Sequence, residues 1–310
     1  MPGRVIEIAS DGRHLAVYRG FMTISAEGKE IGRVPLDDID VLLCNAHGLT
    51  YSNNLLTELS QRGVAVVLCG PNHMPLAWVW PLDGHHVQAL RMRNQLEADE
   101  PLKKRLWQTL VRAKIQQQGA VLAGLGKSEE AFDFLARKVR SGDPDNVEAQ
   151  AARRYWPLLL GDEFRRDRQS GGTNSMLNYG YTVLRAGVAR AIAATGLHPS
   201  IGLHHANRSN PMCLVDDVME PFRPLVDFVV ARLLAQGAQD VSKEVKAELA
   251  LVLSADLTTE RGTTPVSTCI ERLALSLAVS FETGKPALDL PEPLLPLELA
   301  ELRSGPTDEA

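Results

Sequence analysis

The sequence predicts an α+β protein of two domains: a small N-terminal β-domain with one short helix, then a larger all-α C-terminal domain. The first eighty residues alternate short runs rich in β-branched and aromatic residues with turn residues. Beyond Pro81 the chain is rich in Ala, Leu, Gln, Lys, Arg and Glu, with apolar residues at helical spacing. A chain of 310 residues with 45% hydrophobic residues can fill two ordinary domains.

In the N-terminal domain, strands are expected at residues 4–8, 14–18, 21–25, 30–34, 40–43, 64–68 and 76–80. One helix interrupts them. Ser52 precedes NNLLTELSQRG, in which leucines recur at helical spacing and Gly63 supplies a stop. Ser52 is therefore expected to cap this helix rather than to take part in chemistry.

In the second half, apolar stripes typical of helices packed around one core lie at residues 106–115, 177–192, 215–234 and 270–279. The expected division is an N-terminal β-domain of residues 1–83 and a helical catalytic domain of residues 84–285. Residues 286–310 contain repeated prolines and an acidic end, so we expect a flexible tail.

Composition excludes several classes of protein. No apolar run approaches the roughly 18 to 20 residues that cross a bilayer, and the first residues lack the features of a secretory signal. The four cysteines form no CxxC pair, so neither a zinc ribbon nor a disulfide framework is expected. A cytoplasmic protein without membrane contact is predicted.

Charge is distributed unevenly along the chain. Residues 1–99 carry 8 basic and 11 acidic groups, residues 100–170 carry 14 and 10, and residues 171–310 carry 11 and 17, which gives −3, +4 and −6. Charge alone favours solvated helix surfaces over a nucleic-acid site. The basic residues of the middle segment that could form a phosphate-binding face are Lys103, Lys104, Arg105, Arg112, Lys114, Arg137, Lys138, Arg140, Arg153, Arg154, Arg165, Arg166 and Arg168.

The most informative segment is GLHHANRSNPMCLVDDVMEPFRP at residues 202–224, where two histidines lie a short loop away from acidic residues. Glu220 is expected to share one helix face with Asp216 and Asp217, because residues three or four apart project together. A cation or the side chain of Arg223 could neutralise this cluster. Imidazole and carboxylate ligands suit Mg²⁺ or Mn²⁺ and leave positions for water and phosphate, which indicates phosphodiester chemistry.

A simpler interpretation fits this segment equally well when it is taken alone. The aspartates would open a helix at its positive end, and the histidines would be ordinary loop residues. Two further segments decide between the interpretations. DNVEAQAARRYW places Glu148 in a run of strong helix propensity, and NSMLNYGYTVLRAGVARAIAATGLHPSIGLHH leads into the histidine loop.

In their order and spacing these blocks, with LTYSNNLLTELSQRGVAVVLCG and LVDDVMEPFRPLVDFVVARLL, resemble the Cas1 family, the CRISPR-associated integrases of spacer acquisition. The resemblance covers about residues 3–285. LNYGY and DDVMEPFRPLVD are most similar to the members from type II systems, which use Cas9. The family fold is a small β-domain followed by a helical domain, as composition also predicts.

The resemblance implies that Glu148, His205 and Glu220 are catalytic and bind Mg²⁺ or Mn²⁺, with Asp217 as the second acidic position. His205 is preferred because it follows Gly202 by three positions, and His204 is the alternative. A bound metal would activate a 3′-hydroxyl and polarise a phosphate. The implied reaction joins 3′-OH ends of prespacer DNA to the repeat of a CRISPR array by transesterification.

The resemblance also implies supporting residues and partners. Asn178, Tyr179 and Tyr181 could contact DNA backbone or orient the helices that hold the metal ligands, and Arg223 could pair with the acidic cluster or contact DNA. The implied partners are a second copy of the chain, a Cas2 dimer, double-stranded DNA, and in type II systems Cas9 and a further adaptation protein. The candidate DNA-binding residues are Arg137, Lys138, Arg153, Arg154, Arg165 and Arg166.

Two alternative functions stay open at this point. The same ligands would serve a metal-dependent nuclease that acts on particular DNA structures without integration. A protein of a different class, a non-catalytic DNA-binding scaffold, would use the Glu, His and Glu set only for structure.

Overall fold

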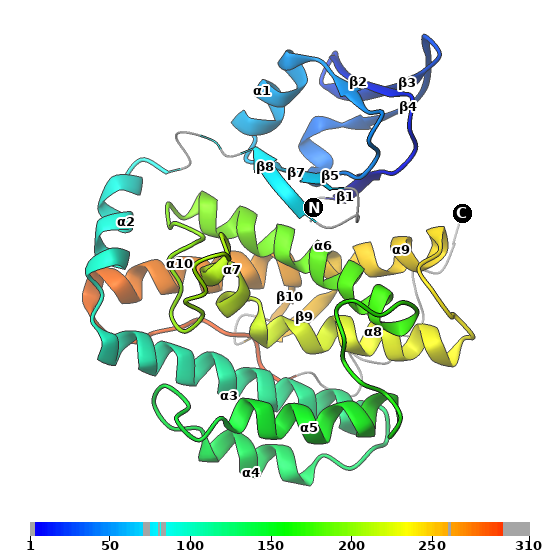
Figure 1. The fold of residues 1–310 in the computed structure, drawn as a ribbon. Helices are drawn as coiled ribbons and strands as arrows, with labels where there is room; N and C mark the ends of the chain where they lie inside the picture. Colours follow the sequence, from blue (N-terminus) through cyan, green and yellow to red (C-terminus); the bar gives the residue numbers. More distant parts are fainter. Residues whose placement is uncertain (1–3, 71–74, 80, 82–84, 260–261, 294–310) are drawn as a thin grey trace.

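The computed structural model describes residues 4–70, 75–79, 81, 85–259 and 262–293. In Figure 1 the β-rich N-terminal part lies above a larger set of helices, so the predicted α+β class is confirmed. The strands of the N-terminal part are β1 (Arg4–Ile8), β2 (Arg13–Tyr18), β3 (Phe21–Ala26), β4 (Lys29–Pro35), β5 (Ile39–Cys44), β6 (Thr50–Tyr51), β7 (Ala65–Cys69) and β8 (Pro75–Val79). The two-residue strand β6 was too short to predict, and Trp80, the last residue of the strand expected at 76–80, lies outside the described residues.

These strands form two sheets. One has the order β4-β3-β2-β6, and the other has the order β1-β5-β7-β8 with β1, β5 and β7 parallel. Helix α1 (Asn53–Gln61) follows β6 and leads into β7. The hydroxyl of Ser52 accepts a hydrogen bond of 3.3 Å from the backbone of Leu55, which confirms the predicted cap.

The side chains of β5 and β7 point alternately into two hydrophobic cores and so join the two parts of the molecule. Leu42 and Val66 point into the core of the N-terminal part. Val41 and Leu43, with their neighbours on β7, point the other way and belong to the same buried cluster as the helices. Successive side chains of a strand face opposite sides of a sheet, so one sheet contributes to two cores.

The helices of the larger part are α2 (Gln88–Glu97), α3 (Glu100–Gly124), α4 (Glu130–Lys138), α5 (Val147–Leu160), α6 (Thr173–Ala194), α7 (Cys213–Val218), α8 (Arg223–Ala235), α9 (Lys243–Ala250) and α10 (Val266–Thr283). Helix α6 is the central helix and packs against α8, α9 and α10. Gly180 permits this packing, because a Cβ there would lie 2.4 Å from Cγ1 of Val226 on α8.

Two local expectations were wrong. The apolar stripe at 215–234 is not one helix: α7 ends at Val218, a 3₁₀ turn covers Glu220–Phe222, and α8 starts at Arg223. Pro221 and Pro224 remove backbone donors there, so helical bonding is interrupted. A hairpin of β9 (Asp256–Thr259) and β10 (Gly262–Pro265) also lies within the helical part, where only helices were expected.

The C-terminal segment beyond α10 is extended where it is described. Leu288 and Leu290 pack against the main core, and the amide of Gln117 donates a 2.9 Å hydrogen bond to the carbonyl of Glu292. Residues 294–310 and the proposed boundary at 83 and 84 lie outside the described residues, so those predictions stay predictions. Within the described ranges, every helix is too short or too polar to cross a bilayer.

Candidate functional site

Glu148 lies in the first turn of α5, and the residues before the helix hold that turn firmly. Asn146 adopts a left-handed backbone conformation with φ of 51°, and its side chain accepts a 3.3 Å hydrogen bond from the backbone of Ala149. The carboxylate of Asp143 accepts from the backbone nitrogens of Val147 at 2.8 Å and Glu148 at 3.0 Å. These acceptors satisfy the free N–H groups of the helix start and fix the position of Glu148.

Glu220 lies in the 3₁₀ turn between α7 and α8, and its side chain is 5% exposed. Arg223 donates from Nε to Oε1 at 2.9 Å, while Nζ of Lys114 lies 2.5 Å from Oε2. Burial opposes ionisation, but Arg223 and Lys114 overcome it and lower the pKa of Glu220 to about 2. Glu220 is therefore a stable buried carboxylate.

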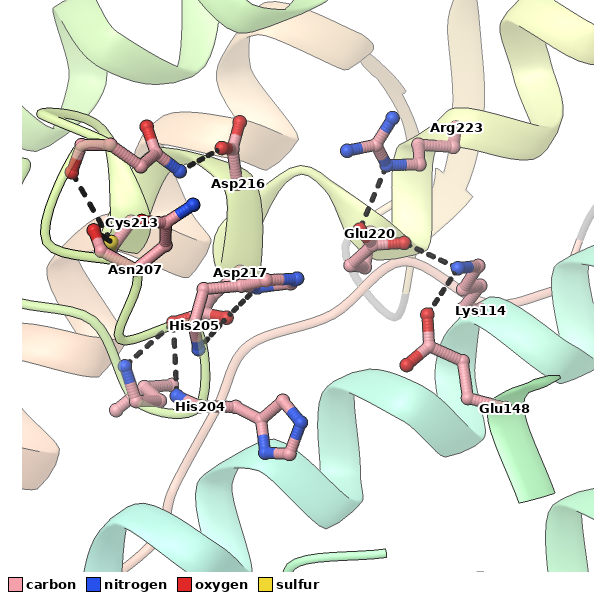
Figure 2. Close-up of polar contacts among 12 residues, drawn as sticks. Lys114, Glu148, His204, His205, Asn207, Cys213, Asp216, Asp217, Glu220 and Arg223 are labelled. Atoms are coloured by element: carbon pink, nitrogen blue, oxygen red, sulfur yellow. Dashed lines mark hydrogen bonds and ion pairs between the residues drawn. The ribbon is translucent and has the colours of Figure 1, made fainter. Parts of the chain in front are cut away.

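Lys114 connects Glu220 to Glu148. It projects from α3, is 12% exposed, and donates a hydrogen bond of 2.6 Å to Oε1 of Glu148 while it contacts Glu220 (Figure 2). Two carboxylates from α5 and from the turn before α8 thus meet at one cation. In the sequence, Lys114 stands out only as one of the basic residues of the middle segment.

Asp217 organises the histidine loop. Its carboxylate is fully buried and accepts from the backbone nitrogens of Leu203 at 2.6 Å and of His204 and His205 at 3.2 Å. It also accepts a 2.6 Å hydrogen bond from Nδ1 of His205. This bond outweighs partial burial and raises the pKa of His205 above its ordinary value. When His205 is neutral and Nδ1 carries the proton, the lone pair of Nε2 can bind a metal.

Trp107, on the same face of α3 as Lys114, packs against both histidines. Its ring stacks on His204 with centroids 4.4 Å apart and an interplanar angle of 1°, and it meets the ring of His205 edge-on at 5.6 Å. Trp107 is buried at 1% exposure. The stack occupies one face of His204, whereas His205 is held by Asp217.

The expectation of one acidic cluster on a single helix face was wrong. Asp216 accepts from Arg185 at 2.9 Å and from Asn210 at 2.6 Å. Asp217 turns to the histidine loop, and Glu220 leaves the face because α7 has already ended at Val218. Each carboxylate therefore has its own counterpart, and no single cation neutralises all three.

The donor set fits a hard divalent cation, but the described residues do not hold it in a preformed cage. No group of three or more His, Cys, Asp and Glu side chains in the described ranges is arranged to bind a metal. Lys114 explains this, because its ammonium lies between Glu148 and Glu220. Oε2 of Glu220 is buried, and its close partner is the ammonium of Lys114 at 2.5 Å. Carboxylate oxygens of this kind are ligands that suit Mg²⁺ or Mn²⁺.

The polar side chains of the LNYGY segment form hydrogen bonds within the protein. Asn178 accepts a 2.7 Å hydrogen bond from Arg166, and the hydroxyl of Tyr179 donates to Glu7 at 3.0 Å. Tyr181 donates to the buried Asp227. These contacts orient helices rather than present groups to solvent.

The candidate DNA-binding residues divide into two sets. Arg166 is half-buried, bonded to Asn174 and Asn178 and placed over the ring of Tyr181, so its guanidinium is engaged in contacts within the protein. The exposed ones, on α4, on α5 and in the loop after it, are Arg137, Lys138, Arg153, Arg154 and Arg165.

Sequence reasoning missed the roles of Lys114, Asp143 and Trp107. Asp143 had a signal, because DPDN before a helix offers several capping side chains. Lys114 and Trp107 had none, since their partners lie 34 residues or more along the chain.

Comparison with known proteins identifies relatives along nearly the whole chain. The model of the family described as CRISPR associated protein Cas1 matches residues 6–260. The "CRISPR-associated endonuclease Cas1" of Neisseria meningitidis is 36% identical over 297 residues, covering 94% of this chain and 96% of that protein. The protein of the same name from Thermus thermophilus, numbered 1, is 33% identical over 246 residues, covering 75% of this chain and 76% of its own.

Solved structures share the fold at low sequence identity. A casposase bound to integration product has a TM-score of 0.77 and 20% identity, with 92% of both chains covered. A Cas1 protein from Thermotoga maritima has a TM-score of 0.73 and 16% identity, covering 92% of this chain and 98% of its own. The family model and the relative from Neisseria meningitidis both span far more than half of the sequence, so the predicted resemblance is confirmed: the chain belongs to the CRISPR-associated Cas1 family.

Proposed function

We propose that the chain is a metal-dependent DNA endonuclease and integrase of CRISPR adaptation, which joins 3′-OH ends of prespacer DNA to the repeat of a CRISPR array. The observation that carries this proposal is the meeting of Glu148 and Glu220, from separate elements, at one cation. His205 lies near enough to influence Glu220 electrostatically. Membership of a family whose relatives are named endonucleases supports nuclease chemistry.

Glu148, Glu220 and Nε2 of His205 would hold Mg²⁺ or Mn²⁺, with Asp217 orienting the imidazole through Nδ1. The bound ion would polarise the scissile phosphate and stabilise the charge that develops on the oxygens of the attacking and leaving groups. Arg223 and the fixed start of α5 keep both carboxylates on well-held backbone, so that they stay close to each other when DNA arrives.

DNA and protein partners follow from the same assignment. One structural neighbour is a casposase bound to integration product, and another is a Cas6-RT-Cas1–Cas2 complex with a TM-score of 0.71 and 16% identity. They support DNA and Cas2 as partners of this chain, while a homodimer, a Cas2 dimer and double-stranded DNA stay predictions. Cas9, a further adaptation protein and a cytoplasmic location stay predictions. The exposed basic residues of α4 and α5 are the proposed contacts to DNA phosphates.

A joining assay tests the proposal. The protein and its Cas2 partner are supplied with a 3′-OH duplex and a supercoiled plasmid that carries a CRISPR repeat, and covalently joined DNA is measured with Mg²⁺, Mn²⁺ or EDTA. We expect metal-dependent joined product. Glu148→Gln and Glu220→Gln should each reduce joining by about 100-fold or more, because each removes a carboxylate ligand.

Glu248→Gln is the matched control, because Glu248 also pairs with an arginine, Arg232, but belongs to α9 and lies outside the proposed set of three ligands. It should keep wild-type activity. Cleavage without any joined product would favour a nuclease that does not integrate. Full joining by a folded Glu148→Gln variant would favour a non-catalytic scaffold.

A further inference from the structure

Lys114 occupies the place between two carboxylates that the proposed function assigns to a metal. Its ammonium lies 2.6 Å from Glu148 and 2.5 Å from Glu220, and its side chain is 12% exposed. The two carboxylates stabilise the ammonium in this buried position. The group is therefore a buried, permanently charged cation at neutral pH.

The charges around this ammonium are balanced without any metal. Glu148 and Glu220 contribute two negative charges, and Lys114 and Arg223 contribute two positive ones. A divalent ion added to this set would leave an excess of two positive charges in a buried volume, which is costly. Withdrawal of Lys114 would reduce this excess from two positive charges to one.

The two cations that contact Glu220 are bound differently. Arg223 makes a directed hydrogen bond of 2.9 Å to Oε1, and Arg223 is fixed at the start of α8. The ammonium of Lys114 lies 2.5 Å from Oε2 and is shared with Glu148. Lysine has four rotatable methylene groups and binds as a point charge. Lys114 is thus the exchangeable partner, and Arg223 is the permanent one.

We infer that Lys114 is a built-in competitor of the catalytic metal: it keeps Glu148 and Glu220 together in the metal-free protein and must withdraw before a divalent cation can bind. This inference rests on the proposed function and adds a residue that sets metal affinity. Lys114 is a positioning residue, because it acts on the ligands and not on DNA.

Metal affinity measured without DNA tests the inference directly. The full-length protein is titrated with Mn²⁺, and free Mn²⁺ is followed by electron paramagnetic resonance. Lys114→Gln and Lys114→Met should each lower the dissociation constant by about tenfold or more, because the competing charge is gone. Lys114→Arg, which keeps the charge, should not tighten binding.

Lys246→Met is the matched control, because Lys246 also forms a largely buried pair with a glutamate, Glu7, but in a different part of the molecule. It should bind Mn²⁺ as the wild type does. Adding Glu148→Gln to Lys114→Gln should abolish the gain, which places the effect at this site. Melting temperature provides a second measurement. Lys114→Gln and Lys114→Met should melt at a lower temperature than wild type in EDTA, and Mn²⁺ should raise their melting temperature by more.

The possible failures are distinguishable. If wild type binds Mn²⁺ and folded Lys114 variants bind it equally or more weakly, the competitor role is wrong while the metal site stands. If neither wild type nor any variant binds Mn²⁺, both this inference and the metal dependence of the proposed function are wrong. A Lys114 variant that stays unfolded even in saturating Mn²⁺ also contradicts the inference, since the metal should replace the missing charge.

Discussion

Asp227 carries a buried carboxyl group close to Arg223 and Lys114, the two cations that contact Glu220. It belongs to α8, is 2% exposed and accepts a hydrogen bond from the hydroxyl of Tyr181. Burial raises the pKa of Asp227 to about 7, although Tyr181 and Arg223 favour the ionised form. The folded protein therefore holds a proton on Asp227 at pH values at which an unfolded chain has lost it.

This difference predicts a pH dependence of stability. Between the ordinary pKa of 3.8 and the folded value of about 7, the folded state binds more protons, so stability falls as pH rises through that window. The contribution is about 4 kcal/mol across roughly three pKa units. Asp227→Asn keeps an acceptor for Tyr181 without the titration, so its free energy of unfolding should lack this decline. Urea unfolding at pH 4 to 8 measures it.

Asp240→Asn, a change at an exposed aspartate, should retain the pH dependence of the wild type. A decline that persists unchanged in Asp227→Asn would show that other groups cause it.

At the scale of elements, the loop between α6 and α7 fixes the histidines through close packing rather than through regular structure. A Cβ on Gly202 would lie 2.5 Å from the carbonyl oxygen of His205 and 2.8 Å from Oδ2 of Asp217. Both atoms belong to the arrangement that orients the imidazole, so any larger residue must displace it. Gly202 is required here for space.

Gly202→Ala should therefore lower both stability and joining activity. We expect a loss of about 1–3 kcal/mol in the free energy of unfolding, as for an overpacked core. Joining should fall more steeply than the fraction folded, because His205 moves. Urea unfolding and the joining assay are measured side by side. Gly171→Ala is the control, since nothing lies within 4 Å of a Cβ there, and equal behaviour of the two variants would contradict the packing argument.

The elements also show how far sequence patterns reach. The longer strands of the N-terminal part and the cap at Ser52 were predictable because their signals are local, whereas the two-residue β6 was not. The break between α7 and α8 was missed, although two prolines marked it, because the apolar stripe continues across the turn. Lys114 was not predictable as the partner of Glu148 and Glu220, since helical spacing specifies the buried face of α3 but not what it meets.

At the scale of the whole molecule, the β-rich part and the helical part share one hydrophobic core. Val41 and Leu43 of β5 are buried in the same cluster as the helices. Polar contacts reinforce this boundary: Glu7 on β1 accepts from Nζ of Lys246 on α9 at 2.8 Å and from the hydroxyl of Tyr179 on α6 at 3.0 Å. The carboxylate of Glu7, 13% exposed, thus ties two helices to the sheet.

The shared core predicts a single unfolding transition, and the polar contacts predict coupling across the boundary. Glu7→Gln and Lys246→Met should each destabilise the protein, since each leaves a largely buried charge without its partner. The double variant should lose less than the sum, with a coupling energy of about 1–3 kcal/mol. Urea unfolding followed by tryptophan fluorescence and by far-UV circular dichroism should give coincident curves for all variants.

Glu30→Gln, which breaks the more exposed pair with Arg33, should cost less than about 1 kcal/mol. Separate transitions for the two signals, or additive losses at Glu7 and Lys246, would mean that the sheet and the helices fold independently.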